Sequence, residues 1–71
     1  MNTALLIAQA RKMINAYIRA EFDPALSDGD AQLLRNERMV LQVTVKSGNA
    51  RHIAEQLVEA TRVAKMWGVA Q

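Results

Sequence analysis

The chain has 71 residues, of which 51% are hydrophobic, 4% are aromatic and 23% are charged, and its formal net charge is +2. This length predicts a single small domain spanning residues 1–71, with a thin core, because short chains bury a small fraction of their surface. The apolar content excludes a disordered tail. The chain contains no cysteine and one histidine, which excludes a disulfide framework and any thiolate or multi-histidine metal site within one chain.

The first segment, residues 3–22, has the 3.6-residue apolar period of an amphipathic helix. Its predicted inner half carries Leu6, Ile7, Ala10, Met13, Ile14, Tyr17 and Ile18, and its outer half carries Gln9, Arg11, Lys12, Asn15 and Arg19. Asp23-Pro24 ends this helix, since proline disfavours the α conformation in the residue before it. A loop follows over residues 23–30, from which we expect Leu26 to point inward and Ser27 or Asp28 to cap the next helix.

Residues 30–46 carry two patterns. The first half, DAQLLRNERM, is typical of helix, whereas in MVLQVTV apolar residues alternate as in a strand, with one face formed by Met39, Leu41, Val43 and Val45. A helix would instead group Leu33, Leu34, Val40, Leu41 and Val45. We favour the helix because the chain shows no second strand, and because Ser47-Gly48-Asn49 is typical of a helix end followed by a new N-cap. The alternative is an α+β fold in which a strand at residues 39–46 pairs across a dimer.

Residues 50–67 show the clearest helical period. The predicted inward seam consists of Ile53, Leu57, Ala60, Ala64 and Trp67, and the opposite face carries Arg51, Glu55, Glu59 and Arg62. Gly68 is expected to end this helix. Three helices of similar length predict an all-α fold, a small three-helix bundle.

Some apolar residues have no place in one core. Met39, Val43, Val63 and Met66 lie off the predicted inward faces and would be exposed on a monomer. Such a surplus favours a second buried face, either in a homodimer or against another protein. We therefore expect these four residues to anchor a protein interface, with Arg35 and Arg38 as charges at its rim.

No set of residues points to catalysis or to a cofactor. The hydroxyl residues lie in no nucleophile motif, the three glycines form no phosphate loop, and so we expect no enzyme activity and no cofactor. Asp23, Asp28 and Asp30 lack the EF-hand spacing, and His52 with Glu55 lies on a predicted polar face, so no metal site is expected. No apolar run approaches the length of a membrane span and the N-terminus lacks signal-peptide features, which predicts a cytoplasmic protein without membrane contact.

By elimination, the sequence predicts binding rather than chemistry. The leading hypothesis is a small regulator or inhibitor that docks on a larger protein through an apolar helical surface, of a kind common among phage and mobile-element accessory proteins. The second hypothesis is a dimeric nucleic-acid-binding transcriptional regulator that contacts phosphates through Arg11, Lys12 and Arg19, which share the outer half of the first helix with no acid among them. The third is a structural subunit of a larger assembly.

Overall fold

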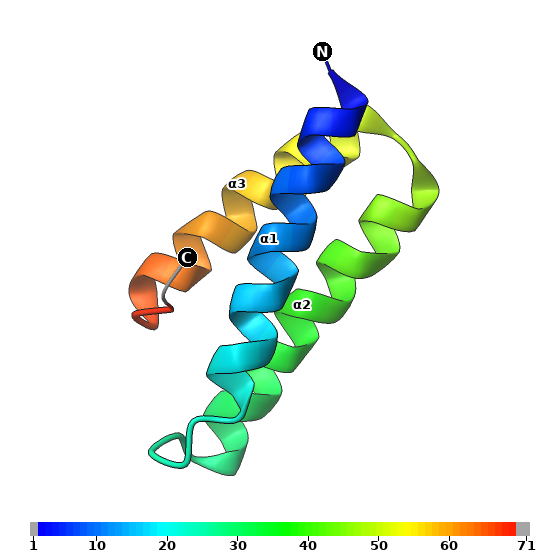
Figure 1. The fold of residues 1–71 in the computed structure, drawn as a ribbon. Helices are drawn as coiled ribbons and strands as arrows, with labels where there is room; N and C mark the ends of the chain where they lie inside the picture. The colour runs from blue at the N-terminus through cyan, green and yellow to red at the C-terminus, as the bar shows by residue number, and fades with distance from the viewer. Residues whose placement is uncertain (1, 70–71) are drawn as a thin grey trace.

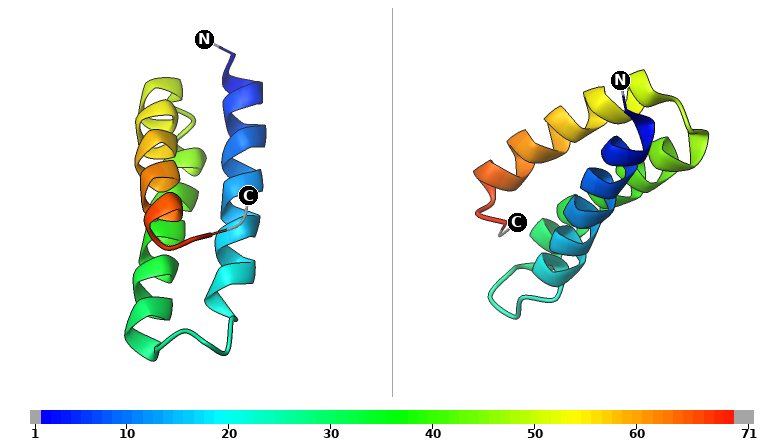
Figure 2. Two further views of the ribbon diagram at one scale, coloured as in Figure 1. Left: turned by 90° about the vertical axis from the view of Figure 1, so that its left-hand side faces the viewer. Right: turned by 45° about the horizontal axis from the view of Figure 1, so that its top comes forward.

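The fold is a three-helix bundle in a computed structural model, which describes residues 2–69 (Figure 1). The helices are α1 (Thr3–Glu21), α2 (Asp28–Ser47) and α3 (Ala50–Met66). α1 and α3 run in the same direction, and α2 runs antiparallel to both (Figures 1 and 2). The predicted all-α class is confirmed. The alternative of a strand at residues 39–46 is wrong, because this segment is helical throughout.

Local side-chain caps fix the helix boundaries. Asn2, Ser27 and Asn49 each accept a hydrogen bond at 3.1 Å from the backbone N–H three residues later, which satisfies a donor that the first helical turn leaves free. Gly48 ends α2 in the left-handed region with φ +71°, where a side chain would be strained. The predicted cap residues Ser27, Gly48 and Asn49 are confirmed.

The core lies along the line where the three helices meet. Its buried residues are Ala10, Met13, Ile14, Tyr17, Leu34, Leu41, Ile53, Ala60 and Ala64. Tyr17 is the largest of them, and its hydroxyl donates a hydrogen bond to the Ala60 carbonyl. Burial, with added repulsion from the Glu37 and Glu59 charges, raises the pKa of Tyr17 to about 12. The predicted inner half of the first helix is confirmed, and Leu26 is half-buried against the core as expected.

The inward face of α2 differs from the prediction. Leu34 and Leu41 are buried and Val45 is half-buried, but Leu33 and Val40 are about half exposed, so their predicted core positions are wrong. The helix is rotated so that the half-buried Arg38 lies beside α1. There it meets Glu21, the one buried charged residue in the described part of the chain.

The end of the bundle that carries the loop after α1 is a two-helix hairpin. α3 ends partway along the other two helices, so the hairpin of α1 and α2 extends beyond it (Figures 1 and 2). Glu21 joins the two helices of this hairpin: its carboxylate accepts from Arg38 Nε at 2.6 Å and from Arg35 Nε at 3.2 Å. Burial alone would raise the pKa of Glu21, but the hydrogen bonds and charges of Arg38 and Arg35 outweigh it and hold the pKa below 4.5.

Candidate interaction surface

The cations of the chain divide into paired and unpaired groups. Arg35 and Arg38 bind Glu21, Arg51 binds Glu55, and Arg62 binds Glu59. Within residues 2–69, no carboxylate lies within ion-pair distance of the remaining cations, which are Arg11, Lys12, Arg19, Lys46 and Lys65. The positive charge that is free to act on a partner therefore comes from this second group.

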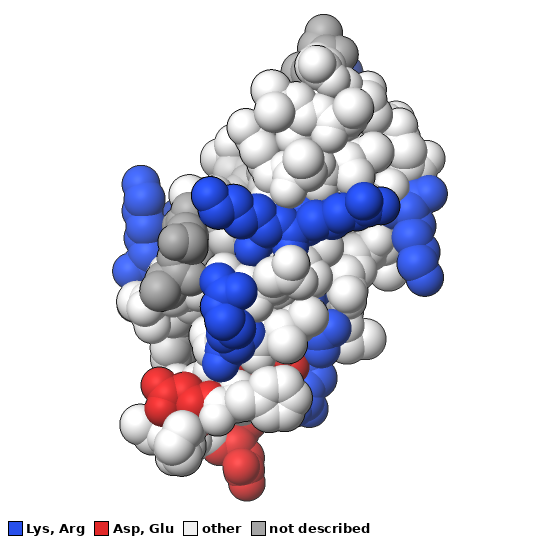
Figure 3. All heavy atoms as spheres, in the orientation of Figure 1, with Lys and Arg blue, Asp and Glu red and all other residues white. Residues whose placement is uncertain are grey.

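Positive and negative charges lie on different parts of the surface. Lys and Arg side chains form a band across the middle of the face that α1 fronts (Figure 3). On the same face, Asp and Glu side chains gather at the end of the molecule that holds the loop between α1 and α2 (Figure 3). A partner that meets the middle of this face therefore meets positive charge.

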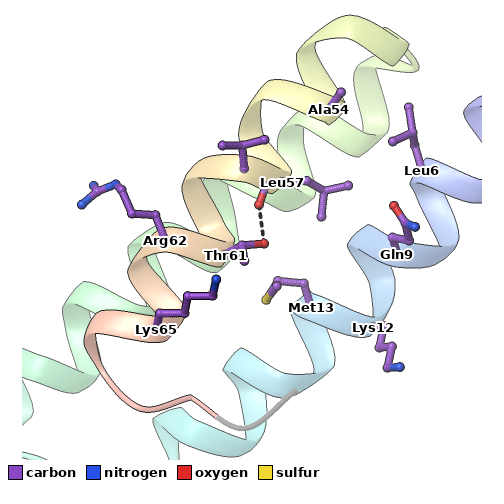
Figure 4. A pocket seen from close by; sticks show the side chains of 10 residues that line it. Leu6, Gln9, Lys12, Met13, Ala54, Leu57, Thr61, Arg62 and Lys65 are labelled. Carbon is purple, nitrogen blue, oxygen red and sulfur yellow. Dashed lines mark hydrogen bonds between the residues drawn. The ribbon is translucent and has the colours of Figure 1, made fainter. Parts of the chain in front are cut away.

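A surface groove with a volume of about 890 Å³, which we call the larger groove, lies between α1 and α3. Leu6 and Met13 of α1 face Ala54, Leu57 and Thr61 of α3 across it (Figure 4). The Thr61 hydroxyl donates to the Leu57 carbonyl at 2.7 Å and is thereby satisfied within α3. The remaining lining residues are Gln9, Lys12, Val58, Arg62 and Lys65. The groove thus has an apolar floor and basic edges.

The smaller groove lies between α1 and α2 and has a volume of about 530 Å³. Met39 and Val43 of α2 line it and are exposed, Val43 to 69%. The buried Ile14 and the half-buried Val45 complete its apolar part. Its polar lining residues are Arg11, Asn15, Gln42 and Lys46. Two of the unpaired cations, Arg11 and Lys46, therefore stand beside the exposed Met39 and Val43.

The structure brings only part of the predicted protein interface together. Met39 and Val43 share the smaller groove, whereas Met66 is exposed on α3 and lines neither groove. Val63 is half-buried against the core, so its expected exposure is wrong. Arg35 and Arg38 are held by Glu21 and are not free rim charges; the Arg38 side chain is only 19% exposed.

The three residues considered for nucleic acid, Arg11, Lys12 and Arg19, are all exposed and belong to the unpaired group. They do not form one compact site, because Arg11 lines the smaller groove and Lys12 lines the larger one, on the other side of α1.

Sequence reasoning missed the groove between α1 and α3. Its most exposed apolar residue is Val58, which is 72% exposed. Val58 directly follows Leu57 in the sequence, and the apolar seam predicted over residues 50–67 did not include it. The missing information was which side of α3 faces α1, and that depends on how the helices pack.

Within residues 2–69, no three His, Asp or Glu side chains gather in a group that could hold a metal ion. Over the same residues, no helix is both long enough and apolar enough to cross a bilayer. Comparisons with protein-family models, with curated proteins and with solved structures found no significant match to this chain.

Proposed function

We propose that this chain is a non-catalytic protein-binding module that regulates or inhibits a larger protein by docking through the groove between α1 and α2. The observation that carries the proposal is the exposure of Met39 and Val43 side by side in a groove whose lining includes two unpaired cations, Arg11 and Lys46. Exposed apolar residues next to charged ones are typical of protein interfaces, in which an apolar centre is surrounded by a polar rim.

The residues that line this groove favour a protein partner with an acidic surface. Met39 is flexible and polarisable, so it adapts to the contour of an apolar partner side chain. Arg11 comes from α1 and Lys46 from α2, so both helices of the groove contribute positive charge. Complementary charge raises the rate of association and fixes orientation, while the apolar contact supplies most of the affinity.

A second candidate function, nucleic-acid binding, is favoured by the five unpaired cations and by the band of Lys and Arg side chains across the face that α1 fronts (Figure 3). Such binding would rest on phosphate contacts and would weaken steeply with added salt. Because the described aromatic residues form no stacking platform in either groove, we rank this function second.

The test is capture of partners from a lysate of the producing cell by the tagged chain and two matched variants. Val43→Glu places a charge in the smaller groove, and Val58→Glu places the same charge on an equally exposed valine of the larger one. We expect a protein that the wild-type chain and Val58→Glu retain after nuclease treatment and a high-salt wash, and that Val43→Glu loses.

Two results would reject the proposal. A protein retained equally by Val43→Glu would move the docking site away from this groove. Material that disappears with nuclease or high salt, and that Arg19→Glu also loses, would transfer the assignment to nucleic acid.

A further inference from the structure

We propose that the groove between α1 and α3 receives the acidic, apolar tip of a second copy of this chain. The tip is the loop end of the α1–α2 hairpin, and it consists of Phe22, Asp23, Asp28, Asp30 and Leu33. This contact is separate from the α1–α2 groove of the proposed function, so the two can succeed or fail independently.

The tip is unusually apolar for an exposed end. Phe22 caps α1 and is 77% exposed, the highest value among the exposed large hydrophobic residues of the described chain. Leu33, one turn into α2, is also exposed. Since α3 ends before it reaches this region (Figures 1 and 2), no third helix covers the hairpin here. An exposed aromatic ring of this kind is a typical anchor residue at a protein interface.

The tip carries the negative charge of three aspartates. Asp23, Asp28 and Asp30 make no ion pair within residues 2–69. Asp23 uses one carboxylate oxygen to accept from the Ala25 N–H at 2.9 Å. Glu21, the other acid nearby, is fully engaged by Arg35 and Arg38, and these two cations are therefore not available to neutralise the aspartates.

The larger groove has the complementary properties. Lys12 and Lys65 line it and carry no ion pair within residues 2–69, whereas the charge of Arg62 is balanced by Glu59. Its floor is formed by aliphatic and thioether side chains from both helices, among them Leu6, Met13 and Leu57. An apolar anchor surrounded by carboxylates thus fits an apolar floor bordered by ammonium groups.

The two grooves differ in how well they suit this occupant. The α1–α3 groove is larger, at about 890 Å³ against about 530 Å³, and so offers more room for a bulky aromatic anchor. The contact joins two different surfaces of the same chain. If each of two copies places its tip in the groove of the other, the result is a closed dimer. If each copy binds the tip of a different copy, the chains assemble into longer oligomers.

The experiment is sedimentation equilibrium of the full chain from about 1 μM to about 1 mM, which covers weak to moderate dissociation constants. We expect the wild-type chain to associate reversibly. Val58→Glu and Phe22→Ala should each weaken association by at least about tenfold, as loss of an interface anchor does. Val43→Glu, the matched control, should leave association unchanged. Circular dichroism of each variant checks that the helices are intact.

A charge exchange tests the pairing itself. Lys12→Glu with Lys65→Glu makes the groove negative, and Asp23→Lys with Asp28→Lys makes the tip positive. Each double variant alone should remain monomeric. An equimolar mixture of the two should associate again. Adding Val58→Glu to both double variants should abolish this association.

The proposal is overturned if the wild-type chain stays monomeric throughout the concentration range, or if Val43→Glu weakens association while Val58→Glu does not. Association that persists in the separate charge variants also overturns it. None of these results bears on partner capture through Met39 and Val43, which the lysate experiment measures by itself.

Discussion

Replacing Glu21 by glutamine should destabilise the fold strongly, because it removes the one buried charge that joins α1 to α2. The Glu21 side chain is 3% exposed, and its carboxylate accepts three hydrogen bonds from Arg35 and Arg38. Removing one partner of a buried ion pair costs about 3–5 kcal/mol. The Arg35 side chain is 45% exposed and can turn to water, whereas that of Arg38 is 19% exposed. Because Arg35 can be solvated, we expect a loss somewhat below this range, about 2–3 kcal/mol.

A loss of this size is large for so small a domain, whose total stability is expected to be about 4–11 kcal/mol. It corresponds to a fall in Tm of about 10–20 °C, measured by circular dichroism at neutral pH. The matched control is Glu55→Gln, which breaks the exposed pair with Arg51 and should change Tm very little, because exposed pairs contribute little. A Tm for Glu21→Gln within about 3 °C of the wild-type value, or an equal loss in the control, would refute the reasoning.

The pH dependence of this loss has a definite sign. The folded-state pKa of Glu21 is lowered from 4.5, so the ionised carboxylate stabilises the fold above that ordinary value. This stabilisation disappears as pH falls through the lower folded-state pKa. The difference in Tm between the wild-type chain and Glu21→Gln should therefore be largest near neutral pH and should shrink in acid.

Three further predictions concern the core and the helix ends. Burial and the Glu59 charge raise the pKa of Glu37 above 4.5, so Glu37→Gln should raise Tm at pH 7. The gain should vanish as pH falls below 4.5, where the carboxyl is protonated in the folded and the unfolded chain. An equal gain at pH 7 and below pH 4.5 would contradict this. Gly48→Ala should lower the free energy of unfolding by about 1 kcal/mol, because φ is +71° there. Gly29→Ala, inside α2, should raise it by about 0.4–1 kcal/mol, and urea unfolding measures both. Changes of the same sign would be inconsistent with the helix ends described. The ultraviolet titration of Tyr17, the only tyrosine, should have its midpoint near pH 12, and a midpoint near 10 would show that the ring is not buried.

The helix boundaries could be predicted because they depend on a few neighbouring residues. Asp23-Pro24 stops α1 and Ser27 caps α2 through its own hydroxyl, and Gly48 with Asn49 separates α2 from α3. The ambiguity over residues 39–46 had a physical cause, since β-branched residues alternate there as in a strand. The helix prevails because Leu41 and Val45 then pack against the core, and tertiary packing outweighs intrinsic preference.

The rotation of α2 could not be predicted from its apolar residues alone. The predicted helical face grouped Leu33 and Val40 with the inward residues, and Arg38 was expected at the rim of an exposed interface. In the structure Arg38 instead lies against Glu21, and a buried carboxylate needs such a charged partner beside it. That pairing joins two residues seventeen positions apart, and nothing in the local pattern of either helix indicates it.

The sequence predicted only the part of the candidate surface that lies on a single helix. Met39 and Val43 lie one turn apart on α2, so the sequence could place them together. The groove between α1 and α3 depends on side chains from two helices that are not consecutive, and its basic edge is defined by which cations lack a carboxylate partner. Charge counting gave a net value of only +2, which conceals the separation of free cations from free acids.

The most direct test of the account is photo-cross-linking in the producing cell, with p-benzoylphenylalanine in place of Val43 or, separately, of Val58. We predict that the probe at position 43 joins the chain to a different, larger protein, and that the probe at position 58 joins it to a second copy of itself. A probe at position 43 that yields no protein adduct, or the same adduct as position 58, would contradict the claim that the groove between α1 and α2 docks a protein partner.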